Sequence, residues 1–128
     1  MTKLTKTEIA RIYREAVAAG KAAGNAATPT PMVVRQHASP LDDASPVTRA
    51  WHVPEGVCGF AWVTVGGNTQ MGRYMRTVKG HGPGYPKGVA YRVGDHGQSL
   101  TRKEAHAYAF ARVLNDAGIT AYVESRMD

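Results

Sequence analysis

The polar residues at the end of the chain are the first candidates for a binding site. Ser125, Arg126 and Asp128 supply a hydroxyl, a guanidinium and a side-chain carboxylate, and the last residue adds the terminal carboxylate. They directly follow an expected strand at 119–124, in which apolar and polar residues alternate. A chain end frays unless contacts tie it down. We therefore expect a polar site at this end of the strand if neighbouring elements hold these groups in place.

A second set of candidates lies on the helix expected before that strand. On the side opposite its apolar stripe the sequence places Arg102, Ala105, Ala109 and Arg112, with His106 beside them. Two alanines between two arginines can seat a flat, anionic ligand, because guanidinium groups bind phosphate in a bidentate manner and stack on planar groups. An ordinary solvent-facing helix surface is the alternative. Arg73 and Tyr85 join Arg126 as further candidates for the same ligand.

The sequence does not predict an enzyme. The five histidines show none of the spacings typical of metal ligands, so neither a metal site nor another cofactor is expected. Cys58 lies in an apolar run and is expected to be a small buried residue rather than a nucleophile. The glycine-rich segment 79–88 matches neither a P-loop nor a dinucleotide-binding motif. It is either a lid over a ligand or a plain connection between elements.

The charge of the chain favours an anionic partner. The 128 residues carry a net charge of +6, and the segment 73–103 holds seven basic residues against one acid. This balance fits nucleic acid, a nucleotide or an acidic protein surface, or only a solvated basic face. No apolar run approaches the length of a membrane span, and the first residues lack the apolar core of a signal peptide. We expect no membrane contact and a cytoplasmic site of action.

Periodicity and turn residues place the elements that would position these groups. A helix is expected over 5–27, opened by a capping box of Thr5 and Glu8. Short strands at 32–34 and 49–53 flank a loop at 37–47, and the apolar run 57–65 reads as a central strand covered on both faces. A second helix follows the turn at 66–68, and a strand covers 89–93. A capping box of Thr101 and Glu104 opens the last helix, which Gly118 ends.

This order of elements predicts the fold class α/β (α+β). We expect a small two-layer single domain, with three helices and a mixed sheet of about four to five strands. The chain 1–128 is divided into an N-terminal helix (1–27), an irregular strand and loop segment (28–56) and an α/β core (57–128). The small-residue N-terminal helix packs either against a second copy of the protein or over one edge of the sheet.

Residues 54–128 resemble a family of small bacteriophage proteins, the Thoeris anti-defence sponges. The similar segments are G-Q-S-x-x-R-K-E-A from Gly97, A-x-A-F-A-x-V-L from Ala107, G-I-x-A-Y from Gly118, the terminal S-R-M-D, and the strand V-C-G-F-A-W-V-x-V. The resemblance implies a protein that sequesters cyclic ADP-ribose-type signals or cyclic oligonucleotides without degrading them.

The same resemblance implies a homo-oligomer that binds its ligands between protomers. The residues it assigns to ligand contact are Arg73, Leu100, Arg102, Ala109 and Arg126. Two features depart from the expected pattern. Ala109 occupies a position where a polar residue is expected, and the segment after Val78 is unusually rich in glycine.

Three functions remain open from the sequence. The first is a non-catalytic protein that binds a small anionic nucleotide through the arginine-flanked groove and the C-terminal residues. The second is a nucleic-acid-binding protein that uses the basic segment 73–103, in which Tyr74, Tyr85 and Tyr91 are interspersed. The third is an inhibitor that docks on a host protein through the N-terminal helix.

Overall fold

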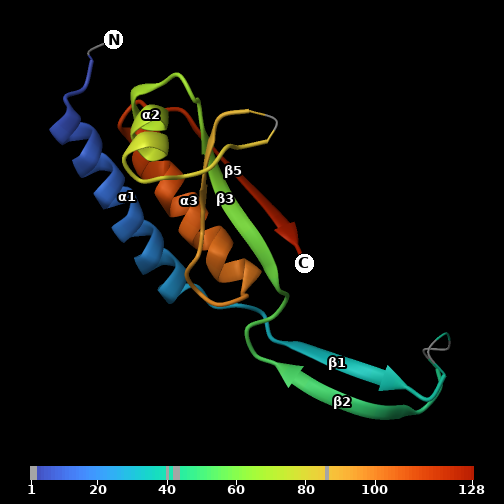
Figure 1. Ribbon diagram of the computed structural model, residues 1–128. Helices are drawn as coiled ribbons and strands as arrows, with labels where there is room; N and C mark the ends of the chain where they lie inside the picture. Colours follow the sequence, from blue (N-terminus) through green and yellow to red (C-terminus); the bar gives the residue numbers. More distant parts are fainter. Residues whose placement is uncertain (1–2, 40, 42–43, 86) are drawn as a thin grey trace.

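The protein is a small α+β domain with three helices, from which a two-stranded hairpin projects (Figure 1). The computed structural model describes residues 3–39, 41, 44–85 and 87–128. In chain order the elements are α1 (Lys6–Ala26), β1 (Met32–His37), β2 (Val47–Val53), β3 (Gly59–Val65), α2 (Gln70–Thr77), β4 (Val89–Arg92), α3 (Leu100–Asp116) and β5 (Ala121–Met127). The expected fold class is confirmed. No helix among these residues is long and apolar enough to cross a membrane.

The main sheet has the order β4-β3-β5 and is antiparallel throughout, whereas a single mixed sheet was expected. Val65, at the end of β3, pairs with both Val89 and Ala121, the first residues of β4 and β5. The α2 connection therefore starts and finishes at the same end of the sheet. Strands β4 and β5 do run parallel to each other, but β3 separates them, so no parallel pair forms.

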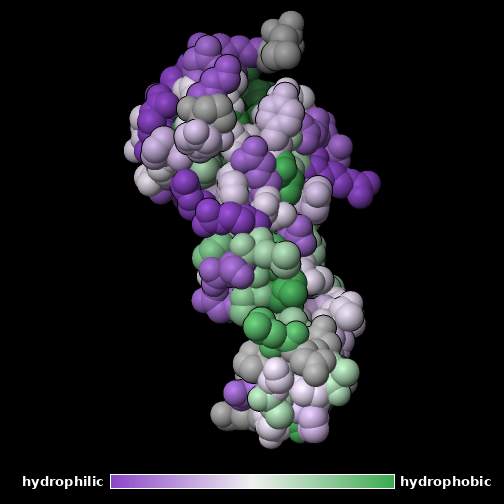
Figure 2. Space-filling view, turned by 90° about the vertical axis from the view of Figure 1, so that its right-hand side faces the viewer, coloured by the Kyte–Doolittle hydropathy of each residue, from purple (hydrophilic) through white to green (hydrophobic). Residues whose placement is uncertain are grey.

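The hairpin β1–β2 forms a separate antiparallel sheet. It extends beyond the end of β3, and among the described residues its two strands pair with no other strand (Figure 1). Val33 on β1, Val57 at the junction and Met127 at the end of β5 are exposed apolar residues. In Figure 2 hydrophobic surface gathers around this junction, while the body above it is mainly polar. The loop at the tip of the hairpin lies partly outside the described residues.

Helix α1 begins as its capping box predicts. The Thr5 hydroxyl accepts the backbone N–H of Glu8 at 3.1 Å and lies 3.1 Å from the Glu8 carboxylate. The helix then continues without interruption past Gly20 and Gly24, both of which are buried. It lies along α3 (Figure 1), because these glycines leave room for side chains of the neighbouring segments. Within the chain, therefore, the buried face of α1 packs on α3.

Helix α3 begins two residues earlier than the Thr101–Glu104 capping box predicts. Ser99 is the N-cap, and its hydroxyl accepts the N–H of Arg102 at 3.3 Å. The N–H of Leu100 donates to the carbonyl of Val57, which fixes the start of the helix by a contact distant in sequence. Glu104 accepts a hydrogen bond from Ser125 instead of capping. The predicted end is confirmed, with Gly118 at φ 84° after Asp116.

Strand β3 is central but covered on one face only, which corrects the expectation of burial on both. Ala61, Val63 and Val65 are buried against the helices. Phe60 and Trp62 alternate with them and remain partly exposed on the other face. All three helices pack on the same side of this sheet (Figure 1). We call the side with the helices the covered face and the opposite side the open face.

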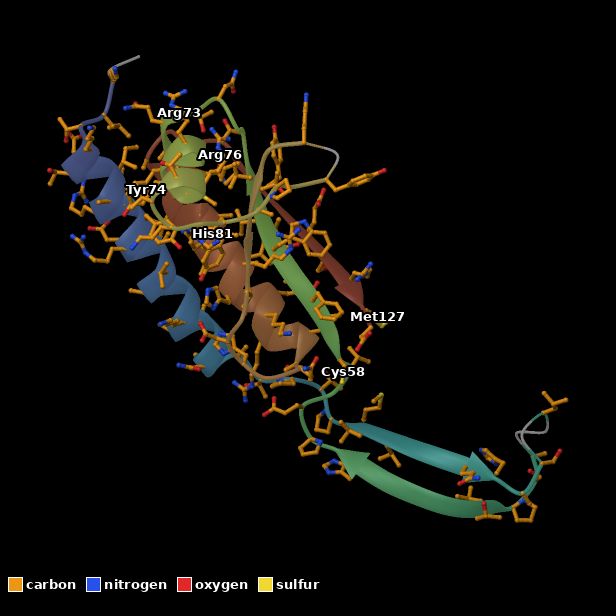
Figure 3. All side chains as sticks on the ribbon, in the orientation of Figure 1. Cys58, Arg73, Tyr74, Arg76, His81 and Met127 are labelled. Carbon is orange, nitrogen blue, oxygen red and sulfur yellow. The ribbon has the colours of Figure 1, made fainter. Side chains whose placement is uncertain are left out.

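Two further expectations near the ends of β3 and β5 are wrong. Cys58 is exposed, because it precedes the first residue of β3 at the hairpin junction (Figure 3). Strand β5 extends to Met127, so the C-terminal residues do not follow the strand but belong to it. Ser125 pairs with Ala61 and Arg126 with Phe60, and the N–H of Asp128 donates to the Cys58 carbonyl at 3.0 Å.

Candidate ligand-binding site

Aromatic and basic side chains are paired across the open face. Phe60 on β3 is opposite Arg126 on β5, and Trp62 lies between Arg92 on β4 and Glu124 on β5. Directly opposite residues of antiparallel strands point to the same side of a sheet and lie in reach of one another. The Trp62 indole N–H donates to the Glu124 carboxylate at 2.8 Å, which fixes the orientation of the indole ring.

A pocket of about 400 Å³ lies over these rows. It is lined by three aromatic residues, two arginines and two smaller residues: Phe60, Trp62, Tyr85, Arg92, Arg126, Ala61 and Val93. Aromatic rings offer flat surfaces for stacking a planar ligand, and guanidinium groups bind anions and stack as well. The combination suits a ligand that is both planar and negatively charged.

The positive charge of this pocket has little ionic compensation. The Arg126 guanidinium lies 5.5 Å from the centroid of the Phe60 ring. The Lys103 ammonium, which comes from α3, lies 5.2 Å from the same centroid. Among the described residues neither cation has an ion pair, although Lys103 is only 5% exposed. Lys103 is buried and does not line the pocket, so the cation without an ion pair that a bound anion would meet is Arg126.

The glycine-rich segment forms one side of the pocket. The N–H of Gly84 donates to the Gly88 carbonyl at 2.9 Å, and the N–H of Ala90 donates to the Gly82 carbonyl at 3.0 Å. Arg92 also donates from Nη2 to the Pro83 carbonyl at 3.2 Å. These bonds fold the segment back on β4 and bring Tyr85, which is 87% exposed, to the pocket. Pro86 lies outside the described residues.

Of the predicted site residues, the structure brings only Tyr85 and Arg126 together in this pocket. Arg73 lies on α2, where its Nη1 donates to the Asn68 carbonyl at 2.6 Å. Figure 3 shows Arg73 at the opposite end of the body from Met127, the neighbour of Arg126. Leu100 is buried at the start of α3 and presents no surface to a ligand in this chain.

The arginine-flanked groove on α3 is not an open anion site. Arg102 makes an ion pair with Glu55 at 2.8 Å and donates to the carbonyls of Gly24 and Asn25, so it caps the C-terminal end of α1. Arg112 is exposed and lies 4.0 Å from the Asp116 carboxylate. Ala105 and Ala109 between them are half-buried. Of the two arginines that the sequence assigned to this groove, Arg102 is therefore engaged by other groups of the protein.

His106 and the remaining C-terminal residues are also placed differently from the expectation. His106 is fully buried, not beside the alanines on an exposed surface. Ser125 donates to the Glu104 carboxylate on α3 at 2.7 Å, on the covered side, while Arg126 points to the open face. Successive residues of a strand point to opposite sides, so Ser125 and Arg126 lie on different sides of β5.

The basic segment 73–103 does not form one surface. Arg73 and Arg76 are on α2, Arg92 is on the open face, and Lys103 is buried. Of the three interspersed tyrosines, only Tyr85 is exposed. A continuous basic stripe with interleaved aromatic rings is therefore absent among the described residues of this segment.

Sequence reasoning missed the pocket residues Phe60, Trp62 and Arg92. The alternation of small and aromatic residues in G-F-A-W indicates an aromatic face, but the general apolarity of 57–65 concealed it. It also missed a cluster of Asp95, His96 and His106 whose ligand atoms lie close enough to hold a metal. Ten residues separate the two histidines, and only the fold brings their rings together.

Comparisons of the chain with protein-family models, with curated proteins and with solved structures found no match to any of the three.

Proposed function

We propose that the protein binds a small anionic nucleotide on its open face and holds it without chemical change. The observation that carries this proposal is the pocket that three aromatic residues and two arginines line together. Nucleobases stack on aromatic rings with about 1–3 kcal/mol per base. Guanidinium groups bind phosphate oxygens in a bidentate manner.

The size and the lining of the pocket agree with such a ligand. Its volume of about 400 Å³ falls in the common range for small-molecule sites, roughly 300–1,000 Å³. None of the seven described residues that line it is a carboxylate, a histidine or a cysteine. General acid–base and nucleophilic catalysis mostly use such groups, so this lining favours binding over turnover. The resemblance to the anti-defence sponges makes cyclic ADP-ribose isomers and cyclic oligonucleotides the first ligands to test.

Single-stranded nucleic acid is the second candidate. The open face exposes Phe60 and Tyr85 beside Arg92 and Arg126, and a row of rings beside cations is the arrangement that single-strand binders use. The two candidates differ in how affinity depends on ligand length and on salt. A mononucleotide-sized pocket saturates with one small ligand. Strand binding strengthens with oligonucleotide length and weakens steeply with salt.

The test is a calorimetric titration of the purified protein with cyclic ADP-ribose isomers, cyclic di- and trinucleotides, NAD and oligonucleotides of increasing length. We expect one small nucleotide to bind and to be recovered intact after the protein is denatured. Arg126→Ala should weaken that binding roughly 10-fold or more, because a hydrogen bond to a charged group contributes about 1.5–3 kcal/mol. Trp62→Leu should weaken it as well, through lost stacking.

Arg112→Ala is the matched control, since it removes one exposed arginine outside the pocket. Equal affinities of Arg126→Ala and Arg112→Ala would contradict the proposed site. Binding that grows with oligonucleotide length would replace the nucleotide by a single strand. The absence of binding by any of these ligands would refute both candidates.

A further inference from the structure

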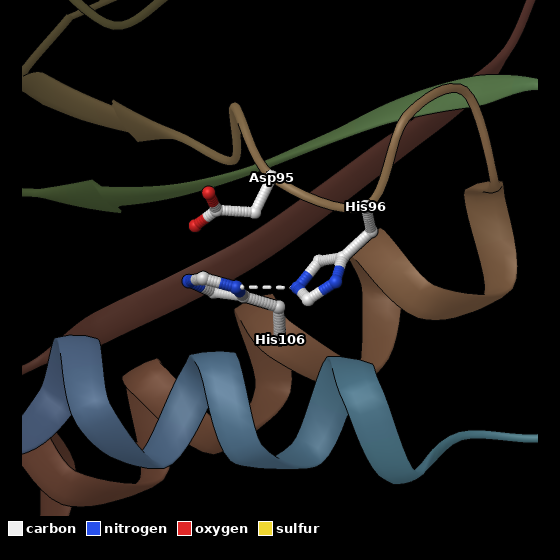
Figure 4. Close-up of side chains that lie close together, drawn as sticks. All are labelled: Asp95, His96 and His106. Atoms are coloured by element: carbon white, nitrogen blue, oxygen red, sulfur yellow. Dashed lines mark hydrogen bonds between the residues drawn. The ribbon is translucent and has the colours of Figure 1, made fainter.

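A second cluster of polar side chains lies on the covered face, away from the pocket. Asp95 and His96 come from the turn between β4 and α3, and His106 comes from the second turn of α3 (Figure 4). A carboxylate oxygen and two ring nitrogens of these residues all lie within 4.8 Å of one another. Two histidines and one carboxylate are a common set of ligands for transition metals.

The ring of His106 is held at both nitrogens. Nε2 lies 2.9 Å from the Tyr91 hydroxyl and Nδ1 lies 3.0 Å from Nε2 of His96. The ring is fully buried, and it stacks against the Tyr91 ring with the two centroids 5.7 Å apart. When Nε2 carries the proton and donates it to Tyr91, Nδ1 directs a lone pair at the space that His96 and Asp95 border.

His96 is held in an unusual backbone conformation that turns its ring inward. Its φ of 72° is the only positive value at a non-glycine position in the described part of the chain. Such conformations persist where the surrounding structure imposes them, and they concentrate at functional sites. Figure 4 shows the His96 ring directed at His106 rather than at solvent.

Helix α1 is shaped to admit the two rings. A methyl group at Gly20 would overlap the His106 ring, and one at Gly24 would overlap the His96 ring. The helix has glycine at both positions, although glycine in a helix interior costs about 0.5–1 kcal/mol relative to alanine. The spacing of four residues places both glycines on the face that meets the cluster.

We propose that Asp95, His96 and His106 bind a divalent transition metal ion of the Zn²⁺ type. Two nitrogens at the Zn–N distance of about 2.0–2.1 Å in a tetrahedral site lie about 3.3 Å apart. The observed 3.0 Å between His96 Nε2 and His106 Nδ1 therefore needs to widen by only a few tenths of an ångström. The Asp95 side chain is exposed and has room to turn toward the ion.

Tyr91 then acts as a positioning residue. A histidine that binds a metal usually donates its other N–H to a fixed acceptor, which sets the tautomer and orients the ring. The Tyr91 hydroxyl occupies that place at His106 Nε2. Tyr91 itself is stacked on Phe110, with ring centroids 4.0 Å apart, so its position is fixed by the core.

Three protein ligands leave a coordination position for water or an outside ligand. The cluster is reachable, because Asp95 is exposed and His96 also lines a pocket of about 550 Å³ with Ser99, Cys58 and Arg102. The positive charge of the nearby Lys21 repels a metal ion bound here, whereas the negative charge of Asp95 attracts it. The site does not depend on the proposed nucleotide pocket, which lies on the other face of the sheet.

The test uses the full chain without an affinity tag, stripped by a chelator and titrated with Co²⁺. We expect the visible absorption of four-coordinate Co²⁺, which Zn²⁺ displaces. His96→Ala and Asp95→Asn should each weaken Co²⁺ binding by roughly 100-fold. Tyr91→Phe should weaken it by roughly 10-fold, because loss of such an outer partner costs about 10–100-fold in metal affinity. Circular dichroism establishes that each variant is folded before titration.

His52→Ala is the matched control, since it removes an exposed imidazole of the hairpin outside the cluster. It should leave the Co²⁺ affinity and spectrum unchanged. Absence of a four-coordinate spectrum at any Co²⁺ concentration that keeps the protein folded would overturn the proposal. Equal affinity of the parent protein and folded His96→Ala would overturn it as well, and would assign the cluster to the packing of α1 on α3 alone.

Discussion

The two faces of the β4-β3-β5 sheet differ in polarity and exposure, although β3 is the central strand of both. On the covered face, Val63 and Val65 are fully buried, and His106 is held neutral among rings. On the open face, Phe60 remains 39% exposed, and Arg92 and Arg126 lie beside it in solvent. Alternation along one strand thus places an apolar core on one face of the sheet and an exposed surface with arginines on the other.

The difference arises from what lies over each face. Helix α3, with α1 packed against it, excludes water from one side. The glycine-rich segment approaches the other side, where methyl groups at Gly84 and Gly88 would lie 3.1 Å and 3.0 Å from the Thr64 methyl. Among the described side chains, the Thr64 hydroxyl is the one buried polar group without a hydrogen-bond partner. A glycine segment shields little surface, so the rings next to it stay accessible.

The sharpest test of this difference compares two phenylalanines. Phe110→Ala should lower the free energy of unfolding by about 3–5 kcal/mol, because Phe110 is fully buried and its loss leaves a cavity. Phe60→Ala should lower it by only about 1–2 kcal/mol, since 39% of Phe60 is already in water. Urea denaturation measures both. Similar losses would show that the open face is part of the core.

The pH dependence of stability tests whether the buried His106 ring on the covered face stays neutral. Because the folded-state pKa of His106, about 4, lies below the ordinary 6.5, the unfolded chain binds more protons between these values. Stability should be full above pH 6.5 and decline toward pH 4, by on the order of 3 kcal/mol in all. Burial also lowers the pKa of His81, with the same sign.

Urea unfolding in the presence of a chelator, at about pH 7.5 and about pH 5, measures this slope without metal. The charged or titratable neighbours of His106 are Tyr91, His96, Asp95 and Lys21. His52→Ala should keep the slope, because that imidazole is exposed. A stability that does not change between the two pH values would mean that His106 accepts a proton without unfolding, and the covered face would then tolerate charge.

Substitution of a glycine in α1 should change the free energy of unfolding by a smaller amount. The sign of that change distinguishes steric overlap with a histidine ring from helix propensity. Gly20→Ala should destabilise the protein by about 1–3 kcal/mol, because the added methyl group overlaps the His106 ring. Helix propensity alone predicts the opposite sign, a gain of about 0.5–1 kcal/mol. Ala22→Gly at an exposed position of the same helix calibrates that propensity. A stabilised Gly20→Ala variant would show that α1 does not press on the histidine cluster.

Local sequence determined much of the fold. Thr5 caps α1 as its spacing to Glu8 predicts, and Gly118 ends α3, because both effects act within one turn of helix. Three helices and five strands follow from periodicity with small errors at their ends. The candidate site was predicted only in part, through Tyr85 and Arg126.

Contacts between distant residues decided the rest. Ser99 replaced Thr101 as the cap of α3 because a hydrogen bond to Val57 fixes where the helix starts. Arg102 became a cap for α1 because the fold places Gly24 and Asn25 within its reach. The packing of the helices on the sheet decides which side of β3 is open. It also brings His96 into contact with His106. Packing joins residues far apart in the chain, and the spacing of residue types along a single sequence carries no record of it.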